Sequence, residues 1–273
     1  MQYLEKEYGC SQRRACRVLS VNRCTARHMT LTDKDSGLRS RLKELAEERK
    51  RFGARRLHVL LRREGLVLNH KRTERIYREE QLALRKCRTR KRVSAPRRPA
   101  EIISGPGECW AMDFVHDNLA DGRAIRILTI IDLWDRTCPR LSVGFSQTGQ
   151  SVIATLNSLK EQEGLPRKIR TDNGPEFTCN ALKVWAENNG ITLEPTRPGK
   201  PTDNGHIESF NGRLRDECLN QHIFESLGDA REKINEWMED YNTVRPHGAL
   251  GWLAPAAFRE KNLNNQDINL SLV

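Results

Sequence analysis

From residue 108 onward the chain consists of short apolar or alternating runs separated by turn signals, and this pattern limits the fold more than any other feature. Such runs predict strands, and the stretches with helical spacing among them predict helices. The predicted elements are strands at 109–115, 125–133 and 141–145, a helix at 151–163, a strand at 168–171, a helix at 179–189 and a strand at 191–194. The sequence therefore predicts an α/β domain whose first three strands are antiparallel.

The front of the chain differs from the rest in charge. Residues 1–100 hold 29 Lys and Arg against 11 Asp and Glu, whereas residues 101–273 hold 18 against 25, and the chain of 273 residues has a formal charge of +11. A chain of this length accommodates two domains. The basic front indicates binding to a polyanion, although a solvated basic surface explains the same charge.

Two helical segments are expected in this basic front. Residues 8–28 fit a helix-turn-helix in which Ser11 caps the first helix and Asn22 caps the second. Residues 38–86 fit three further helices, of which the second ends at Gly65 and the third follows a capping Asn69 and continues to residue 84.

The third of those helices carries four cations, Lys71, Arg72, Arg75 and Arg78. Lys71, Arg75 and Arg78 share a face because they are spaced by four and three residues. Such a face suits a helix that lies against DNA, but a solvated basic face is an equally good interpretation.

A linker and two further helices complete the expected organisation. Proline, glycine and basic residues between 88 and 107 indicate a linker. A helix that Thr202 or Asp203 caps would carry Glu208, and a helix at 228–241 has apolar residues at core spacing. The predicted boundaries are a helix-turn-helix region at 1–87, a linker at 88–107, a catalytic core at 108–225 and a C-terminal helix and tail at 226–273.

Three acidic residues stand out in these elements. Asp113 lies within an apolar strand, where a carboxylate is costly unless it is paired or binds a metal ion. Asp172 follows a short strand, and 35 residues separate it from Glu208. Carboxylates from two strands and a helix suit a pair of divalent ions that perform phosphoryl chemistry.

Two strings of residues around these acids carry a family resemblance, TDNGPEF at 171–177 and ESFNGRLRDECLN at 208–220. With Asp113 they resemble the transposases of bacterial insertion sequences whose core is similar to retroviral integrase, and most closely the second-reading-frame product of the IS-three family. The resemblance covers nearly the whole chain. It implies a ribonuclease-H-like core with a mixed five-stranded sheet and helices, preceded by an all-α helix-turn-helix region, and metal-dependent cleavage and transfer of DNA strands.

The resemblance also implies roles for individual residues. Asp113, Asp172 and Glu208 would be catalytic and would hold two Mg²⁺ ions, for which Mn²⁺ can substitute. Arg215 matches a position that is Lys or Arg in the family and would bind phosphate. The other residues expected to contact DNA are Asn173, Asn211, Lys200, Lys71, Arg72, Arg75 and Arg78.

Other acids and two histidines compete for the same roles. Asp117 falls in an expected turn, and Glu176 would begin a helix where its charge suits the dipole. His116 and His206 flank catalytic acids, but DNA contact or packing explains them better than base catalysis because bound ions already activate the nucleophile. The remaining competing acids are Asp132, Asp135 and Asp203.

Zinc and export are not expected. None of the eight cysteines forms a Cys-x-x-Cys pair, and no nearby histidine pair has zinc-ligand spacing. Retroviral integrases carry an amino-terminal zinc module that this sequence does not match. With no recognisable leader or membrane-spanning run, we expect a bacterial cytoplasmic protein that associates with the nucleoid and contacts no membrane.

The expected partners are double-stranded DNA, both the element's terminal repeats and its target, and further copies of the chain assembled on that DNA. The upstream-frame product of the same element is a possible third partner. Two other functions fit the sequence: a regulator that occupies element ends without cutting, and a ribonuclease-H-like nuclease that acts on hybrids or junctions.

Overall fold

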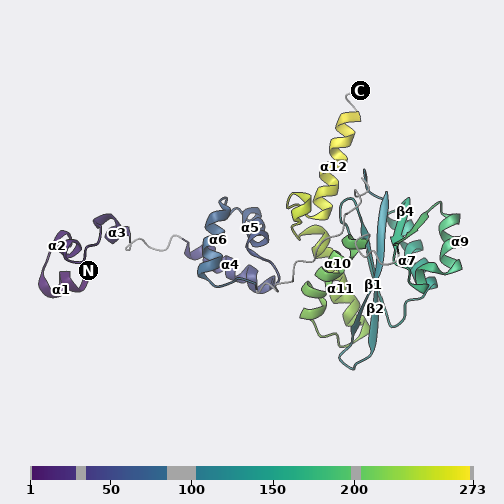
Figure 1. Ribbon diagram of the computed structural model, residues 1–273, viewed down its shortest axis with the longest axis horizontal. Coiled ribbons are helices and arrows are strands. Elements are labelled where there is room, and N and C mark those ends of the chain that lie inside the picture. Colours follow the sequence, from purple (N-terminus) through teal and green to yellow (C-terminus); the bar gives the residue numbers. More distant parts are fainter. Residues whose placement is uncertain (1, 29–34, 85–102, 198–203, 271–273) are drawn as a thin grey trace.

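The computed structural model describes residues 2–28, 35–84, 103–197 and 204–270, and no helix in these ranges is long and apolar enough to cross a membrane. Two small helical groups precede a larger group built on a sheet (Figure 1). The front helices are α1 (Gln2–Tyr8), α2 (Gln12–Val18), α3 (Arg23–His28), α4 (Ser36–Glu48), α5 (Ala54–Arg63) and α6 (His70–Glu79). The prediction of an all-α front is confirmed.

The predicted side-chain caps begin three of these helices. Ser11 accepts a hydrogen bond from a backbone N–H of α2 at 3.4 Å, Asn22 from one of α3 at 2.9 Å and Asn69 from one of α6 at 3.0 Å. Each satisfies a donor that the first turn of a helix leaves free. Two predictions were incomplete, because α6 ends at Glu79 rather than at residue 84 and α1 was not expected.

Helices α4, α5 and α6 share a hydrophobic core of their own. Leu42, Leu57, Leu61 and Ile76 are fully buried in it. The helical spacing of these residues places one face of each helix inward. The three helices therefore form one packed unit, called here the helical unit (residues 35–84).

The predicted five-stranded mixed sheet is confirmed. Its strand order is β3-β2-β1-β4-β5, with β1, β2 and β3 antiparallel and β1, β4 and β5 parallel. The strands are β1 (Cys109–Asn118), β2 (Ala124–Asp132), β3 (Arg140–Gly144), β4 (Lys168–Thr171) and β5 (Thr192–Pro195).

One strand is longer than predicted. Asp117 was expected in a turn, but it lies in β1 and pairs with Ile125 of β2. The turn comes later, where Asp121 accepts a hydrogen bond from the backbone N–H of Arg123 at 2.9 Å. The polar end of β1 is held by its backbone ladder to β2, which an apolar pattern does not reveal.

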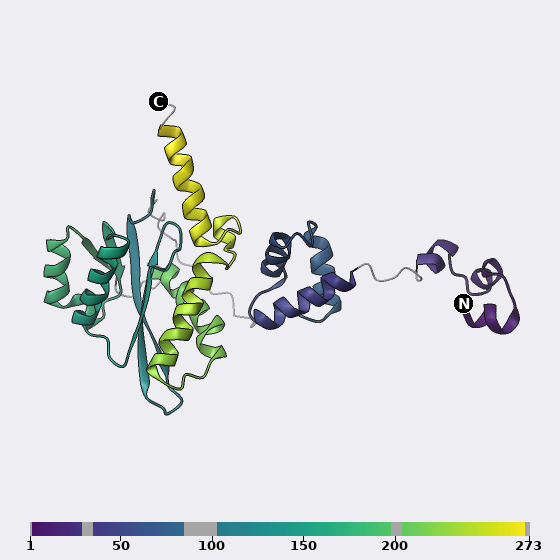
Figure 2. The ribbon, with the colours of Figure 1, turned by 180° about the vertical axis from the view of Figure 1, so that it is seen from behind.

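Helices cover both faces of the sheet (Figure 2). On one face lie α7 (Gly149–Gln162), α8 (Pro175–Thr178) and α9 (Asn180–Asn188). On the other lie α10 (Gly205–Glu217) and α11 (Leu227–Thr243), with short 3-10 turns at Leu219–Gln221 and Gly248–Leu250. The last helix, α12 (Pro255–Leu270), packs on α11 and extends away from the sheet (Figure 1).

Side chains of β1 alternate between these two faces. Ala111 and Val115 belong to the core beneath α10 and α11, whereas Met112 belongs to the core beneath α7 and α9. Since successive side chains of a strand point to opposite faces, Asp113 points toward α10 and α11. An acid thus occupies a position in a row of otherwise apolar residues.

The described end of the predicted linker already contacts the sheet domain. Ile103 packs on its core, and the backbone N–H of Gly107 donates to Asp132 at 2.7 Å. Residues 85–102 lie outside the described ranges. The domain boundaries proposed from the sequence stay predictions.

Candidate active site

The sheet register brings Asp113 and Asp172 together. Ala111 of β1 is opposite Arg170 of β4 in a parallel pair, so the same register continued by two residues places Asp113 opposite Asp172. Neighbouring strands lie about 4.8 Å apart. Arg170 and Asp172 are on the face away from Ile169, which packs beneath α7 and α9. Both acids therefore face α10.

Helix α10 supplies the third acid. Its buried residues Ile207, Phe210 and Leu214 belong to the core against β1, which fixes the side of the helix that faces the sheet. Glu208 stands beside this buried face and is exposed. The predicted caps Thr202 and Asp203 lie outside the described residues.

The three carboxylates influence one another electrostatically. Burial raises the pKa of Asp113 above its usual range, and the negative charges of Asp172 and Glu208 raise this pKa further. Hydrogen bonds from the Phe114 N–H and the Asn211 amide lower it in part. Asp113 thus lies within reach of the charges of both other predicted acids.

The three predicted carboxylates are spread apart rather than clustered. Within the described ranges, no group of three or more His, Cys, Asp or Glu side chains is close enough to hold a metal ion. The Asp172 carboxylate accepts a hydrogen bond from the N–H of Gly174 at 3.1 Å. The structure therefore places Asp113 and Asp172 side by side and Glu208 within electrostatic range, and the set of three ligands stays a prediction.

Asn211 is the polar residue bound most directly to these acids. Its Nδ2 donates to Asp113 Oδ2 at 2.8 Å, while its buried Oδ1 has no hydrogen-bond partner in the described structure. Because positions 208 and 211 are three residues apart, this contact lies on the side of α10 that carries Glu208. Asn211 was predicted to contact DNA; the structure shows its contact with Asp113, and the contact with DNA stays a prediction.

Asn173 and Arg215 occupy the edges of the site. Asn173 Nδ2 donates to the backbone O of Thr196 at 2.8 Å, which ties the turn after β4 to the chain after β5. Arg215 is exposed, and its Nη2 donates to the backbone O of His116 at 3.2 Å. Their contact with DNA stays a prediction, as does that of Lys200, which lies outside the described residues.

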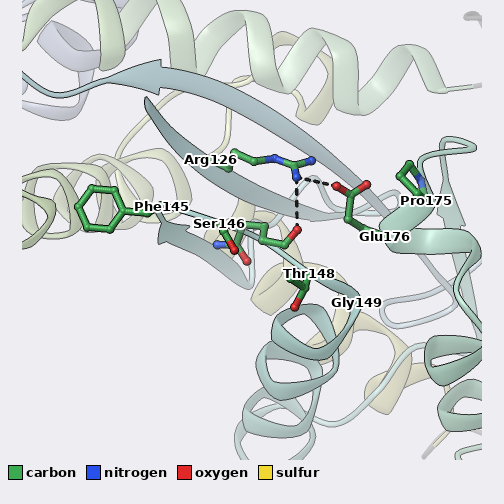
Figure 3. Close-up of a pocket in the computed structure, with 8 residues that line it drawn as sticks. Arg126, Phe145, Ser146, Thr148, Gly149, Pro175 and Glu176 are labelled. Atoms are coloured by element: carbon green, nitrogen blue, oxygen red, sulfur yellow. Dashed lines mark hydrogen bonds and ion pairs between the residues drawn. The ribbon is translucent and has the colours of Figure 1, made fainter. Parts of the chain in front are cut away.

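Glu176 forms an ion pair with Arg126. It lies in the first turn of α8, as predicted, and its Oε1 is 2.6 Å from Arg126 Nη1 (Figure 3). Arg126 also donates to the backbone O of Gln147 at 3.3 Å. Arg126, Gln147 and Glu176 line a pocket of about 380 Å³. This guanidinium lowers the pKa of Glu176. The carboxylate holds α8 against β2.

Asp132 and Asp135 are also structural. Both side chains are fully buried, and Arg259 of α12 pairs with Asp135 and lies 3.7 Å from Asp132. Asp132 further accepts from Trp110 Nε1 at 3.2 Å. These acids hold α12 against the end of β2. Asp203, the remaining competing acid, lies outside the described residues.

The predicted cations of α6 differ in their surroundings. Arg72 and Arg75 both form ion pairs with Asp35, at the start of α4. Lys71 and Arg78 are exposed. The shared face that the sequence predicts for Lys71, Arg75 and Arg78 is present on a helix, although one of its cations is partly neutralised.

The end of α11 and the residues that follow it hold α10 and the β2–β3 loop in place. Arg245 is 1% exposed and donates to Glu217, the last residue of α10, at 2.7 and 2.6 Å. Asn242 accepts from the N–H of Cys138 and donates to its O, each at 2.9 Å. Because these pairs join residues far apart in the sequence, no local pattern signals them.

Comparison with known proteins agrees with this architecture. Residues 104–201 and 189–255 match the family described as Integrase core domain, and residues 33–92 match the family described as HTH-like domain. The chain is 43% identical to the "Insertion element IS407 uncharacterized 31.7 kDa protein" of Burkholderia multivorans, over 98% of this chain and 97% of that protein. The chain belongs to the insertion-element transposases.

Two further comparisons concern this transposase. It is 44% identical to the "Insertion element IS476 uncharacterized 39.2 kDa protein" of Xanthomonas euvesicatoria, over 95% of the transposase and 75% of that protein. The fold is also shared with a chain of the simian T-cell lymphotropic virus intasome, solved in complex with PP2A regulatory subunit B56 gamma. The TM-score is 0.53 and the sequence identity is 16%, over 80% of the transposase and 73% of that chain.

These relationships confirm the family resemblance and the function expected from the sequence. The transposase acts in DNA transposition and integration, and its integrase-like core makes it a polynucleotidyl transferase. Its HTH-like and core domains bind DNA.

Proposed function

We propose that Asp113, Asp172 and Glu208 are the catalytic carboxylates of this transposase and hold two divalent ions, Mg²⁺ or, in its place, Mn²⁺. The observation that carries this assignment is the geometry at Asp113: Asn211, on the side of α10 that carries Glu208, donates to Asp113 at 2.8 Å, and the β1–β4 register leads to Asp172. Like charges gathered beside a buried carboxylate favour a bound cation. The structural acid Glu176 differs, because Arg126 already neutralises it.

The donor atoms fit this chemistry. Carboxylate oxygens are the ligands that Mg²⁺ and Mn²⁺ prefer. A bound pair of such ions supplies activation of the attacking oxygen and stabilisation of the leaving oxygen in an in-line displacement. The buried, unpaired Oδ1 of Asn211 supports the fit, since a hydrated cation beside Asp113 offers the donor that this oxygen lacks.

The remaining side chains position the reacting groups. Asn211 orients Asp113 through its 2.8 Å hydrogen bond, and Asn173 holds the turn that presents Asp172. Arg215 offers a guanidinium to a phosphate beside the cut. The site then cleaves one DNA strand at an element end with water, and the released 3′ hydroxyl attacks a second phosphodiester in line.

The proposed partners follow from this reaction. Cutting and joining require both a terminal repeat and a target duplex, and joining two ends calls for at least two copies of the chain on DNA. The upstream-frame product of the element is the further partner that we propose, as an aid to binding the ends.

The test is strand cleavage and joining on labelled duplexes that end in the element's own repeats, with Mg²⁺, Mn²⁺ or EDTA. We expect metal-dependent products from the wild type and a loss of at least about 100-fold in Asp113→Asn, Asp172→Asn and Glu208→Gln, because each removes a ligand charge. Full activity of any folded variant contradicts its assignment. Binding without products, even after the upstream-frame product is added, favours the regulator.

Asp117→Asn is the matched control. It makes the same chemical change on the same strand and the same face, about 13 Å from Asp113 at the rise of a strand. We expect it to retain wild-type activity. A comparable loss in this variant would show that the assay reports damage to β1 rather than the loss of a ligand.

A further inference from the structure

The helical unit contacts the sheet domain through ion pairs. Arg49 pairs with Asp240 of α11 at 2.5 Å, and Arg51 pairs with Asp216 of α10 at 2.8 Å. Arg63 donates to the backbone O of Val244 at 2.5 Å. The segment between α4 and α5 and the end of α5 therefore contact α10 and the end of α11.

A cleft of about 1050 Å³ lies between the two parts. Five arginines line it: Arg51, Arg55, Arg56 and Arg78 from the helical unit, and Arg213 from α10. The carboxylates in the lining are fewer: Glu74, Asp216 and Glu217. Cations thus outnumber anions on its walls.

Three of these arginines keep their charge available. Arg51 and Arg56 have carboxylate partners in Asp216 and Glu217. Within the described ranges, no carboxylate forms an ion pair with Arg55, Arg78 or Arg213, and the first two are exposed.

The neighbouring cations act on Arg56. Burial and then the charge of Arg245 lower its pKa to about 10 although Glu217 opposes this, and Arg213 adds a smaller contribution. A site where guanidinium groups repel one another gains energy from an anion placed between them. The cleft therefore suits a ligand with several negative charges.

The cleft and the proposed active site share one helix. Ser209, Gly212 and Arg213 of α10 line the cleft, whereas Glu208 and Asn211 lie toward Asp113. A Cβ added at Gly212 would meet no atom within 4 Å, so the cleft is open at this point. Arg213 lies about 7.5 Å along the helix axis from Glu208 and about 140° around it, so the two residues stand on different faces of α10, less than two turns apart.

We propose that this cleft binds the sugar-phosphate backbone of the DNA duplex that flanks the cut, with Arg55, Arg78 and Arg213 each neutralising a phosphate. The inference rests on the proposed function, because that function places the cut beside Glu208. Guanidinium groups bind phosphate oxygens in a planar, two-pronged geometry. Helix α6 then contacts DNA through Arg78 while α10 holds the same duplex at the site.

The test measures affinity for a repeat-containing duplex as a function of salt, in EDTA so that no cleavage occurs. Each lost phosphate contact reduces the slope of log affinity against log salt by about 0.9, which corresponds to about fivefold weaker binding at 0.15 M salt. We expect this change in Arg55→Gln, Arg78→Gln and Arg213→Gln. Wild-type slopes in all three, or no DNA binding by the wild type, overturn the inference.

Arg167→Gln is the matched control, because Arg167 is exposed and precedes β4 at the end of the strand opposite to Asp172. We expect an unchanged slope. Arg213 is half-buried, so thermal melting checks its folding, and the exposed Arg55 and Arg78 decide the outcome if Arg213→Gln unfolds.

The same samples separate this inference from the proposed function. Reduced slopes in the cleft variants without metal-dependent products from the wild type support the cleft and contradict the catalytic assignment. Metal-dependent products together with unchanged slopes contradict the cleft alone. A fluorescent acidic peptide that binds the wild type and that DNA does not displace would assign the cleft to a protein partner. That result would also overturn the inference.

Discussion

Replacement of Arg245 by Met should destabilise the transposase by about 3 kcal/mol. Arg245 is 1% exposed and Glu217 is 10% exposed, and two hydrogen bonds of 2.7 and 2.6 Å join them. Removing one partner of a buried ion pair costs about 3–5 kcal/mol because the other charge stays buried. We expect the lower end of that range, since Arg56 remains 3.4 Å from Glu217.

The assay is urea unfolding followed by tryptophan fluorescence, with thermal melts beside it. A loss of about 3 kcal/mol corresponds to a fall in melting temperature of about 6–12 °C for a domain of this size. The control is Arg123→Met, which breaks the exposed pair with Asp121 and should cost less than about 1 kcal/mol.

A double variant tests the cause. Replacing the pair, as Arg245→Met with Glu217→Met, removes the buried carboxylate that Arg245→Met leaves behind and should recover part of the lost stability, although Arg56 then loses its partner Glu217. The reasoning is refuted if Arg245→Met costs no more than Arg123→Met, or if the double variant is less stable than Arg245→Met alone.

Two further outcomes follow. Glu176→Gln should lower the free energy of unfolding by about 1 kcal/mol at neutral pH, because Arg126 lowers the native pKa of Glu176. This difference should disappear as the pH falls through that native pKa. Unfolding curves from pH 7 to pH 3 measure it, and a difference independent of pH contradicts the reasoning. Mg²⁺ at 100 times its dissociation constant should stabilise the wild type by about 2.7 kcal/mol for each ion bound. The Asp172→Asn variant should gain less stability from the same Mg²⁺ concentration. Equal gains of the two proteins in thermal melts would place the ion elsewhere.

Much of the sheet domain could be predicted because its pattern is local. Apolar runs gave the strands, and the position of Asp172 after a short strand placed it at a strand end. The polar end of β1 was missed, because Asp117 is held by backbone pairing with Ile125 rather than by an apolar face.

Long-range contacts explain what the sequence did not reveal. Helix α12 depends on Phe258 packing against Trp134 and on the pair of Arg259 with Asp135, neither of which leaves a periodic signal. Likewise, Asn211 was expected to contact DNA, but its hydrogen bond to Asp113 and its unpaired oxygen depend on the crossing of α10 over β1, which no local pattern reveals.

The place of Asp113 among the apolar residues of β1 has an evolutionary consequence. Ala111 and Val115 bury the strand, so an asparagine at position 113, which still accepts the hydrogen bond from Asn211, would keep the fold at little cost. With Asp113 in its proposed catalytic role, a copy of the element with such a substitution would make a stable, DNA-binding protein that does not cut. It would compete with active copies for their ends, so a single codon change would turn a mobile element into an inhibitor of its own kind.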